Sequence, residues 1–154
     1  MRRRDFISVL GCAAATALPR AARAQASDAP LVGFLNSASA ATYRFNADSF
    51  RQGLAEAGFV EGRNVRIEER WANGDYNALP ALAAELVKQG VVAIAATGDV
   101  ASASAVKGVT TTIPAVFTIG GDPVRFGLVA SYNRPGGNLT GIAFVPNQLG
   151  AKRM

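Results

Sequence analysis

The chain has 154 residues, of which 49% are hydrophobic, and a formal net charge of +5. This composition is typical of a folded domain and excludes a disordered chain. The sequence contains no histidine, which excludes Ser-His-Asp and Cys-His nucleophile systems and every histidine-ligated metal site.

The N-terminus predicts an export signal over residues 1–24. The basic cluster Arg2-Arg3-Arg4 precedes an apolar stretch over residues 7–18, and Ala22-Arg23-Ala24 has the small-x-small pattern of a signal peptidase site. The order Arg3-Arg4-Asp5-Phe6-Ile7 is typical of the twin-arginine class. We therefore expect cleavage near Ala24 and a periplasmic mature protein.

Removing this leader changes what the charge implies. The leader holds five arginines and one aspartate, so residues 25–154 carry 11 basic and 10 acidic residues. Nucleic-acid binding then loses its main compositional support, and we expect no nucleic-acid partner. The single cysteine, Cys12, also lies in the leader. The mature chain is therefore expected to have no disulfide and no cysteine-based site.

Strand-like and helix-like segments alternate after the leader. The predicted strands cover residues 31–35, 65–71, 91–96, 113–119 and 140–145, and the predicted helices cover 47–57, 79–87 and 100–107, with a short helix or turn from 120 to about 127. The alternation over 65–71 predicts a strand nearer an edge. The run over 91–96 is apolar throughout, which predicts a strand covered on both faces.

This order of elements predicts an α/β fold, a parallel sheet with helices on both faces. Ligands of such sheets bind outside the carboxyl ends of the strands. The segments that follow the predicted strands carry small or hydrogen-bonding residues: Asn36-Ser37, Trp71-Ala72-Asn73, Thr97-Gly98-Asp99 and Gly120-Gly121-Asp122. The topology therefore predicts a binding site at these four loops.

Each loop also has a purely structural interpretation. Asp99 is as well suited to capping the following helix as to touching a ligand, and Asp122-Pro123 is an ordinary helix opening. Asn36-Ser37 fits a turn, and Trp71 fits the core better than a stacked ligand. No Walker-type loop is present and no Gly-x-Gly-x-x-Gly follows a strand, so we expect no nucleotide or other cofactor.

Several short motifs occur in a characteristic order along the chain. They cover residues 50–54, 58–65, 70–75 and, most specifically, 113–124, 127–129 and 134–141. Together they resemble the substrate-binding proteins of ABC transporters in the tryptophan/tyrosine-type group, which have the type I periplasmic binding fold. The resemblance implies a solute receptor rather than an enzyme. Two α/β lobes would close on a small, amino-acid-like solute, and the closed form would dock on an ABC permease.

The resemblance also implies site residues and domain limits. Ligand contacts of the first lobe would come from Asn36, Ser37, Thr97, Gly98 and Asp122. Members of this family are much longer than 154 residues. Residues 25–145 are therefore expected to form the N-terminal lobe, and residues 146–154 to begin the crossover to a second lobe that is largely absent, which makes the chain a fragment.

Two other functions stay open at this point. One is a ligand-sensing domain for a signalling partner, because the same fold serves both tasks. The other is an exported α/β enzyme. The lack of histidine, of a mature cysteine and of a Gly-x-Ser-x-Gly motif counts against that enzyme.

Overall fold

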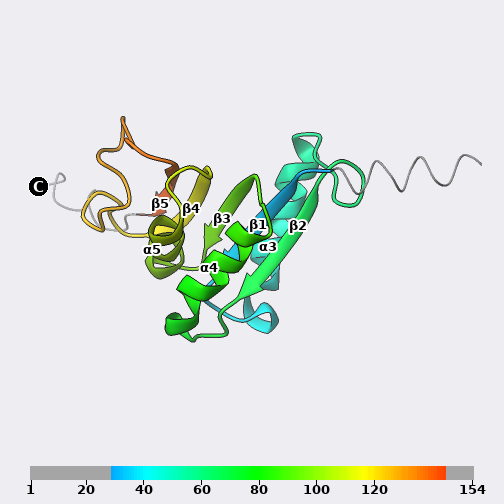
Figure 1. Cartoon of the computed structure of the whole chain (residues 1–154), viewed down its shortest axis with the longest axis horizontal. Coiled ribbons are helices and arrows are strands. Elements are labelled where there is room, and N and C mark those ends of the chain that lie inside the picture. The colour runs from blue at the N-terminus through cyan, green and yellow to red at the C-terminus, as the bar shows by residue number, and fades with distance from the viewer. Residues whose placement is uncertain (1–28, 145–154) are drawn as a thin grey trace, which may run out of the picture.

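The computed structural model describes residues 29–144, which form one five-stranded parallel sheet with helices on both faces (Figure 1). This confirms the predicted α/β class. The leader over residues 1–24, with Cys12, and the crossover over residues 146–154 lie outside the described residues. The strands are β1 Leu31–Asn36, β2 Arg66–Trp71, β3 Ala93–Thr97, β4 Ala115–Gly120 and β5 Leu139–Phe144. The helices are α3 Ala40–Glu56, α4 Leu79–Lys88 and α5 Val100–Val109, with a 3-10 turn η1 at Tyr76–Ala78.

The strands lie in the order β2-β1-β3-β4-β5, and every neighbouring pair is parallel. β2 is at one edge, as its alternation predicts, and β3 is central with Ile94, Ala95 and Ala96 buried. β5 forms the other edge of the described sheet and pairs with β4 along its whole length, from Leu139 beside Ala115 onwards. The carboxyl ends of all five strands therefore meet at one edge of the sheet, where the predicted site lies.

Two separate cores pack against the two faces. Alternate residues of a strand point to opposite faces, so Phe34 packs under α3 with Ala47 and Ala95, and the next residue, Leu35, joins the larger core on the other side. We call the first side the α3 face. The other side, the α4/α5 face, is covered by α4, α5 and the loop that precedes β5; it buries Leu86, Ile94, Ala103, Val106, Phe117 and Leu128.

Some element boundaries differ from the sequence prediction for local reasons. β3 begins at Ala93 rather than Val91 because the Val91 N–H still bonds back to the carbonyl of Leu86 in α4. β4 begins after Pro114, which has no N–H to donate to a strand ladder. α3 begins seven residues before the predicted helix. The prediction missed its first two turns because they are mostly exposed and carry no apolar stripe.

Candidate functional site

The site is built on the last residues of β1 and β3. Asn36 and Thr97 lie side by side in the sheet, and the Asn36 amide nitrogen donates to the Thr97 hydroxyl at 2.9 Å. The Asn36 Oδ1 accepts the N–H of Ala38 at 2.8 Å. Asn36 is fully buried. Its polar atoms are used inside the protein, so Asn36 supports the loops that form the site.

Ser37 directly follows Asn36 in the chain, and Gly98 directly follows Thr97. Gly98 has a φ of +99°, a conformation that favours glycine, and a Cβ at this position would lie 2.6 Å from the Ser37 hydroxyl oxygen. The same Cβ would lie 2.9 Å from Asn36 Oδ1. Glycine is therefore required both by the turn and by the close approach of the two loops.

A cavity of about 300 Å³ opens to solvent beside these loops. Its lining residues are Ser37, Ala38, Tyr43, Gly74, Tyr76, Gly98 and Asp99. Two of the predicted site residues, Ser37 and Gly98, therefore line one cavity. Thr97 lines a neighbouring hollow with Thr118 and Ile142 instead.

Two tyrosines form part of the wall, and sequence reasoning missed both. Tyr43 lies in the first turns of α3, where its φ of −120° and ψ of 21° interrupt the helix. Tyr76 begins the 3-10 turn η1, whose N-cap Asp75 accepts the N–H of Asn77 at 3.0 Å. The one available signal was an aromatic residue placed shortly after the end of a strand.

Asp99 is both a helix cap and a lining residue. Its Oδ1 accepts the backbone N–H groups of Ala101 at 2.9 Å and Ser102 at 3.2 Å, which confirms the capping interpretation. A hydrogen bond from the Tyr76 hydroxyl to Asp99 raises the pKa of Tyr76 above its ordinary value. Asp99 is the one charged side chain among the lining residues, which gives the cavity a negative character.

Asp122 lies at the end of β4 and does not line this cavity. Its Oδ1 accepts the N–H groups of Val124 at 2.9 Å and Arg125 at 3.4 Å. Burial acts to raise the pKa of Asp122, but the hydrogen bonds from Val124 and from the Tyr132 hydroxyl outweigh it and hold that pKa below its ordinary value. The side chain thus stabilises the turn after β4, and its ligand role stays a prediction.

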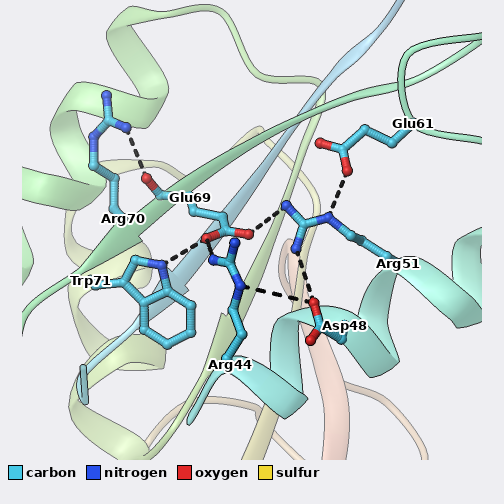
Figure 2. Close-up of polar contacts among 7 residues, drawn as sticks. All are labelled: Arg44, Asp48, Arg51, Glu61, Glu69, Arg70 and Trp71. Carbon is cyan, nitrogen blue, oxygen red and sulfur yellow. Dashed lines mark hydrogen bonds and ion pairs between the residues drawn. The ribbon is translucent and has the colours of Figure 1, made fainter. Parts of the chain in front are cut away.

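An ion-pair network joins α3 to β2 (Figure 2). Glu69 Oε2 of β2 accepts from Arg44 Nη1 and from the Trp71 indole nitrogen, each at 2.8 Å, and Arg51 Nη2 lies 2.5 Å from Glu69 Oε1. Arg51 Nε also donates to Glu61 at 2.6 Å. Since Arg44 directly follows Tyr43, the network holds the part of α3 that carries a lining residue.

The network shifts the ionisation of its members. Burial favours a higher pKa for Glu69, but the hydrogen bonds from Trp71 and Arg51 lower that pKa below its ordinary value. Trp71 packs on Phe34 with ring centroids 5.5 Å apart, which confirms its core role. These pairs are structural, and they leave the carboxylate of Glu69 occupied.

Other site types find no support within residues 29–144. This part of the chain contains no group of three or more Asp or Glu side chains that could hold a metal ion. No helix of the same part is long and apolar enough to cross a membrane.

Known proteins are similar to this chain in sequence and fold. A sequence profile of the family described as ABC transporter substrate binding protein matches residues 38–151. A tyrosine-binding protein of Clostridioides difficile is 34% identical over 92 residues, which are 60% of this chain and 26% of that protein.

Two solved structures are similar to this chain in fold and sequence. One is an ABC domain from Streptococcus pneumoniae in complex with L-Trp, with a TM-score of 0.68 and 25% identity. The other is the ligand-free, open form of a substrate-binding protein with adhesive properties from Clostridium difficile, with a TM-score of 0.69 and 26% identity. Each match covers 75% of this chain, but only 38% and 39% of the respective relative.

The chain thus spans well under half the length of the relatives it matches. The profile covers most of the described residues, including β3 and the loop that follows it, and begins just after the end of β1. The matched family consists of solute-binding proteins and is not an enzyme family. The chain therefore belongs to the family of ABC transporter substrate-binding proteins.

Proposed function

We propose that this chain is the N-terminal, solute-binding lobe of a receptor for an ABC uptake transporter, and that its solute is a small molecule of the amino-acid type. The observation that carries the proposal is the cavity at the carboxyl ends of β1 and β3, lined by Ser37, Tyr43, Tyr76, Gly98 and Asp99. Ligands of parallel α/β sheets bind at this place. The L-Trp complex and the tyrosine-binding relative support the same solute class.

The lining offers a partner for each part of an amino acid. The Asp99 carboxylate attracts an ammonium group. The Ser37 hydroxyl can donate a hydrogen bond to a carboxylate. The rings of Tyr43 and Tyr76 offer flat apolar surface to the solute's side chain. One zwitterion can therefore engage all three kinds of group.

The export leader and the partner follow from the same proposal. Residues 1–24 would direct the chain across the inner membrane by the twin-arginine route, with cleavage near Ala24 and release into the periplasm. There the loaded receptor would dock on its ABC permease. We assign the first wall of the cleft to residues 29–144 and the second wall to a second lobe, in keeping with the greater length of the relatives. The first wall alone leaves the solute in contact with water, so we expect it to bind more weakly than about micromolar.

The test separates the charge of Asp99 from its capping role. Asn caps helices as well as Asp does, so Asp99→Asn keeps the α5 cap and removes the negative charge. We compare the affinity of the chain for L-tyrosine and for its deaminated analogue, 3-(4-hydroxyphenyl)propionate, by NMR titration at millimolar ligand.

The wild-type chain should prefer L-tyrosine, and Asp99→Asn should lose that preference while its thermal midpoint stays unchanged. A matched control is Asp75→Asn, which changes a cap outside the cavity lining and should keep the preference. Equal affinity of the wild-type chain for both compounds would contradict the assigned role of Asp99, and no binding of either would contradict the proposed function.

A further inference from the structure

The loop that follows β2 is a four-residue turn. The Asp75 N–H donates to the Ala72 carbonyl at 2.9 Å and closes the turn. Both central residues have a positive φ, +54° at Asn73 and +85° at Gly74. Asn73 is the one residue other than glycine with a positive φ within residues 29–144. Two consecutive positive φ angles are typical of a type I′ turn, for which Asn-Gly is a preferred central pair.

This turn is clamped to the loop that follows β1. The Gly74 N–H donates to the Ser37 carbonyl at 2.8 Å, and the Asn73 N–H donates to the Ala38 carbonyl at 3.1 Å. The Asn73 side chain is also held, because its amide nitrogen donates to the Trp71 carbonyl at 3.3 Å. Ser37, Ala38 and Gly74 line the candidate solute cavity. These bonds, which we call the clamp, therefore hold one side of the cavity in place.

An asparagine that precedes a glycine can convert itself to an acid. The backbone nitrogen of the glycine loses its proton and attacks the carbonyl carbon of the asparagine side chain. A new C–N bond forms, the bond to the amide nitrogen breaks, and that nitrogen leaves as ammonia with the proton returned to it. Water then opens the resulting succinimide ring at either carbonyl, which gives aspartate or isoaspartate. Glycine favours this attack because it has no side chain to shield its nitrogen.

We propose that Asn73-Gly74 is a site of spontaneous covalent modification whose rate is controlled by the clamp. Both residues are exposed within the described part of the chain, and no atom lies within 4 Å of the Cβ position of Gly74, so the ring has room to form. In the closed clamp, however, the Gly74 nitrogen keeps its proton on the Ser37 carbonyl, and the Asn73 amide stays on the Trp71 carbonyl. The reaction therefore proceeds from molecules in which the clamp has opened. Two hydrogen bonds of ordinary strength make that open form about tenfold or more rarer than the closed form.

Conversion prevents the clamp from closing again. An ionised aspartate has no donor for the Trp71 carbonyl. Isoaspartate carries the main chain through the former side chain and adds one carbon to the turn, so the two N–H groups no longer match the carbonyls of Ser37 and Ala38. The new carboxylate also adds negative charge beside a cavity whose one charged lining side chain is Asp99. The loop at Ser37 should loosen and solute should bind more weakly; this last consequence rests on the proposed function.

Mass spectrometry of peptides from the 154-residue chain, sampled during incubation in mildly alkaline buffer, tests the proposal. Conversion changes the mass of one peptide, and isoaspartate methyltransferase labels the isoaspartate product. The folded chain is compared with the chain unfolded in guanidinium chloride, and the exposed Asn133, which precedes Arg134, is the internal reference. Asn36→Ala removes the partner of the Ala38 N–H and should loosen the clamp. Asn77→Ala, at an exposed position, is its matched control.

We expect Asn73 to convert in the folded chain while Asn133 stays intact, at a rate about tenfold or more below that of the unfolded chain. Asn36→Ala should raise this rate, and Asn77→Ala should leave it unchanged. Equal rates in the folded and unfolded chain would overturn the control by the clamp, and this comparison stands even where Asn36→Ala does not fold. An Asn73 that is intact after about a hundred half-lives of the unfolded chain would overturn the site itself.

The modified chain carries one more negative charge, so anion exchange separates it from the unmodified chain for two further measurements. Hydrogen exchange of the Ala38 amide should become about tenfold faster or more, and the affinity for L-tyrosine should fall about fivefold or more. Unchanged hydrogen exchange would overturn the link between the modification and the cavity. An unmodified chain that binds no L-tyrosine would contradict the proposed function, whereas the mass and the hydrogen exchange would still decide the present inference.

Discussion

The amide nitrogen of Asn36 lies 2.9 Å from the hydroxyl of Thr97 and joins the last residues of β1 and β3 directly beneath the candidate solute cavity. Because the same asparagine accepts the N–H of Ala38, one buried side chain fixes two of the loops that form the cavity. Both bonds lie within the protein, so they hold the loops of the candidate cavity in place without a bound solute. Asn36 therefore supports the cavity, whereas Ser37, Gly98 and Asp99 line it.

Replacing Asn36 should lower the stability of the fold and should not remove a direct contact with the solute. Asn36→Ala leaves the part-buried N–H of Ala38 without its partner and removes the bond to Thr97. We expect the free energy of unfolding to fall by about 1–3 kcal/mol. Urea denaturation measures it. Asn77→Ala, at an exposed position, is the control and should change the value by less than about 0.5 kcal/mol. An equal effect of both changes would show that the Asn36 bonds contribute nothing.

Gly98 should tolerate no side chain. In Gly98→Ala the new methyl group would lie 2.6 Å from the Ser37 hydroxyl, at a backbone φ of +99°. We expect a loss of about 1–3 kcal/mol in the free energy of unfolding, together with weaker solute binding. Gly108→Ala is the matched control, because Gly108 lies inside α5 with open space around its Cβ position. It should stabilise the protein by about 0.5–1 kcal/mol. Urea denaturation of both variants measures this difference. Equal free energies of unfolding for the two variants would be inconsistent with strain at Gly98.

Glu69 should make the stability depend on pH in acid. Its pKa is lower in the folded chain than in the unfolded chain, because the bonds from Trp71 and Arg51 outweigh the opposing effect of burial. The ionised carboxylate therefore stabilises the fold above the unfolded pKa, and this contribution is lost as the pH falls through the folded pKa. Glu69→Gln should reduce the free energy of unfolding by about 1 kcal/mol at pH 7, and should flatten its decline below about pH 4.5.

The measurement for Glu69 is urea denaturation at a series of pH values from neutral to acid. Glu56→Gln is the control, since Glu56 is exposed and its one bond is to Gln52 in the same helix. Its curve should follow that of the wild-type chain. If the free energies of unfolding of the wild-type chain and of Glu69→Gln changed in parallel with pH, the network would not favour the ionised form of Glu69 over the protonated form.

The leader can be tested by changing two residues. Arg3→Lys with Arg4→Lys keeps the positive charge but removes the arginine pair that the twin-arginine route reads. We expect the wild-type chain in the periplasmic fraction, shortened by 24 residues, and the double variant uncut in the cytoplasm. Mass spectrometry of both fractions measures this. The change Arg20→Lys, outside the pair, is the control and should be exported. Export of the double variant would assign the leader to the general secretion route.

The fold was predictable from the sequence because its signals are local. The apolar run over residues 31–35, the alternation of β2 and the continuous apolar stretch of β3 each indicate which faces of a strand are buried. The strand-end rule also pointed to Ser37 and Gly98, which line the candidate cavity. It could not place Tyr43 and Tyr76, because a break in α3 and a 3-10 turn set their positions, and neither leaves a periodic trace in the sequence.

The exposure of the α3 face of β4 and β5 within residues 29–144 was unpredictable for a different reason. Val116, Ile142 and Phe144 have the apolar character of core positions, and only the direction of the crossovers shows which face lacks a helix. The same holds for Asp122, whose loop leads to the α4/α5 face, where Leu128 is buried. A strand end alone therefore does not decide whether the following loop lines the candidate cavity.

The central claim is that solute binds at the ends of β1 and β3. The most direct measurement is a residue-resolved NMR titration of the chain with L-tyrosine and L-tryptophan. We predict fast-exchange shifts centred on the amides of Ser37, Ala38, Gly74, Gly98 and Asp99, reduced by Tyr43→Ala and unaffected by Phe126→Ala, which alters an exposed ring outside the cavity lining. Shifts centred elsewhere, or no shifts at saturating ligand, would contradict the account.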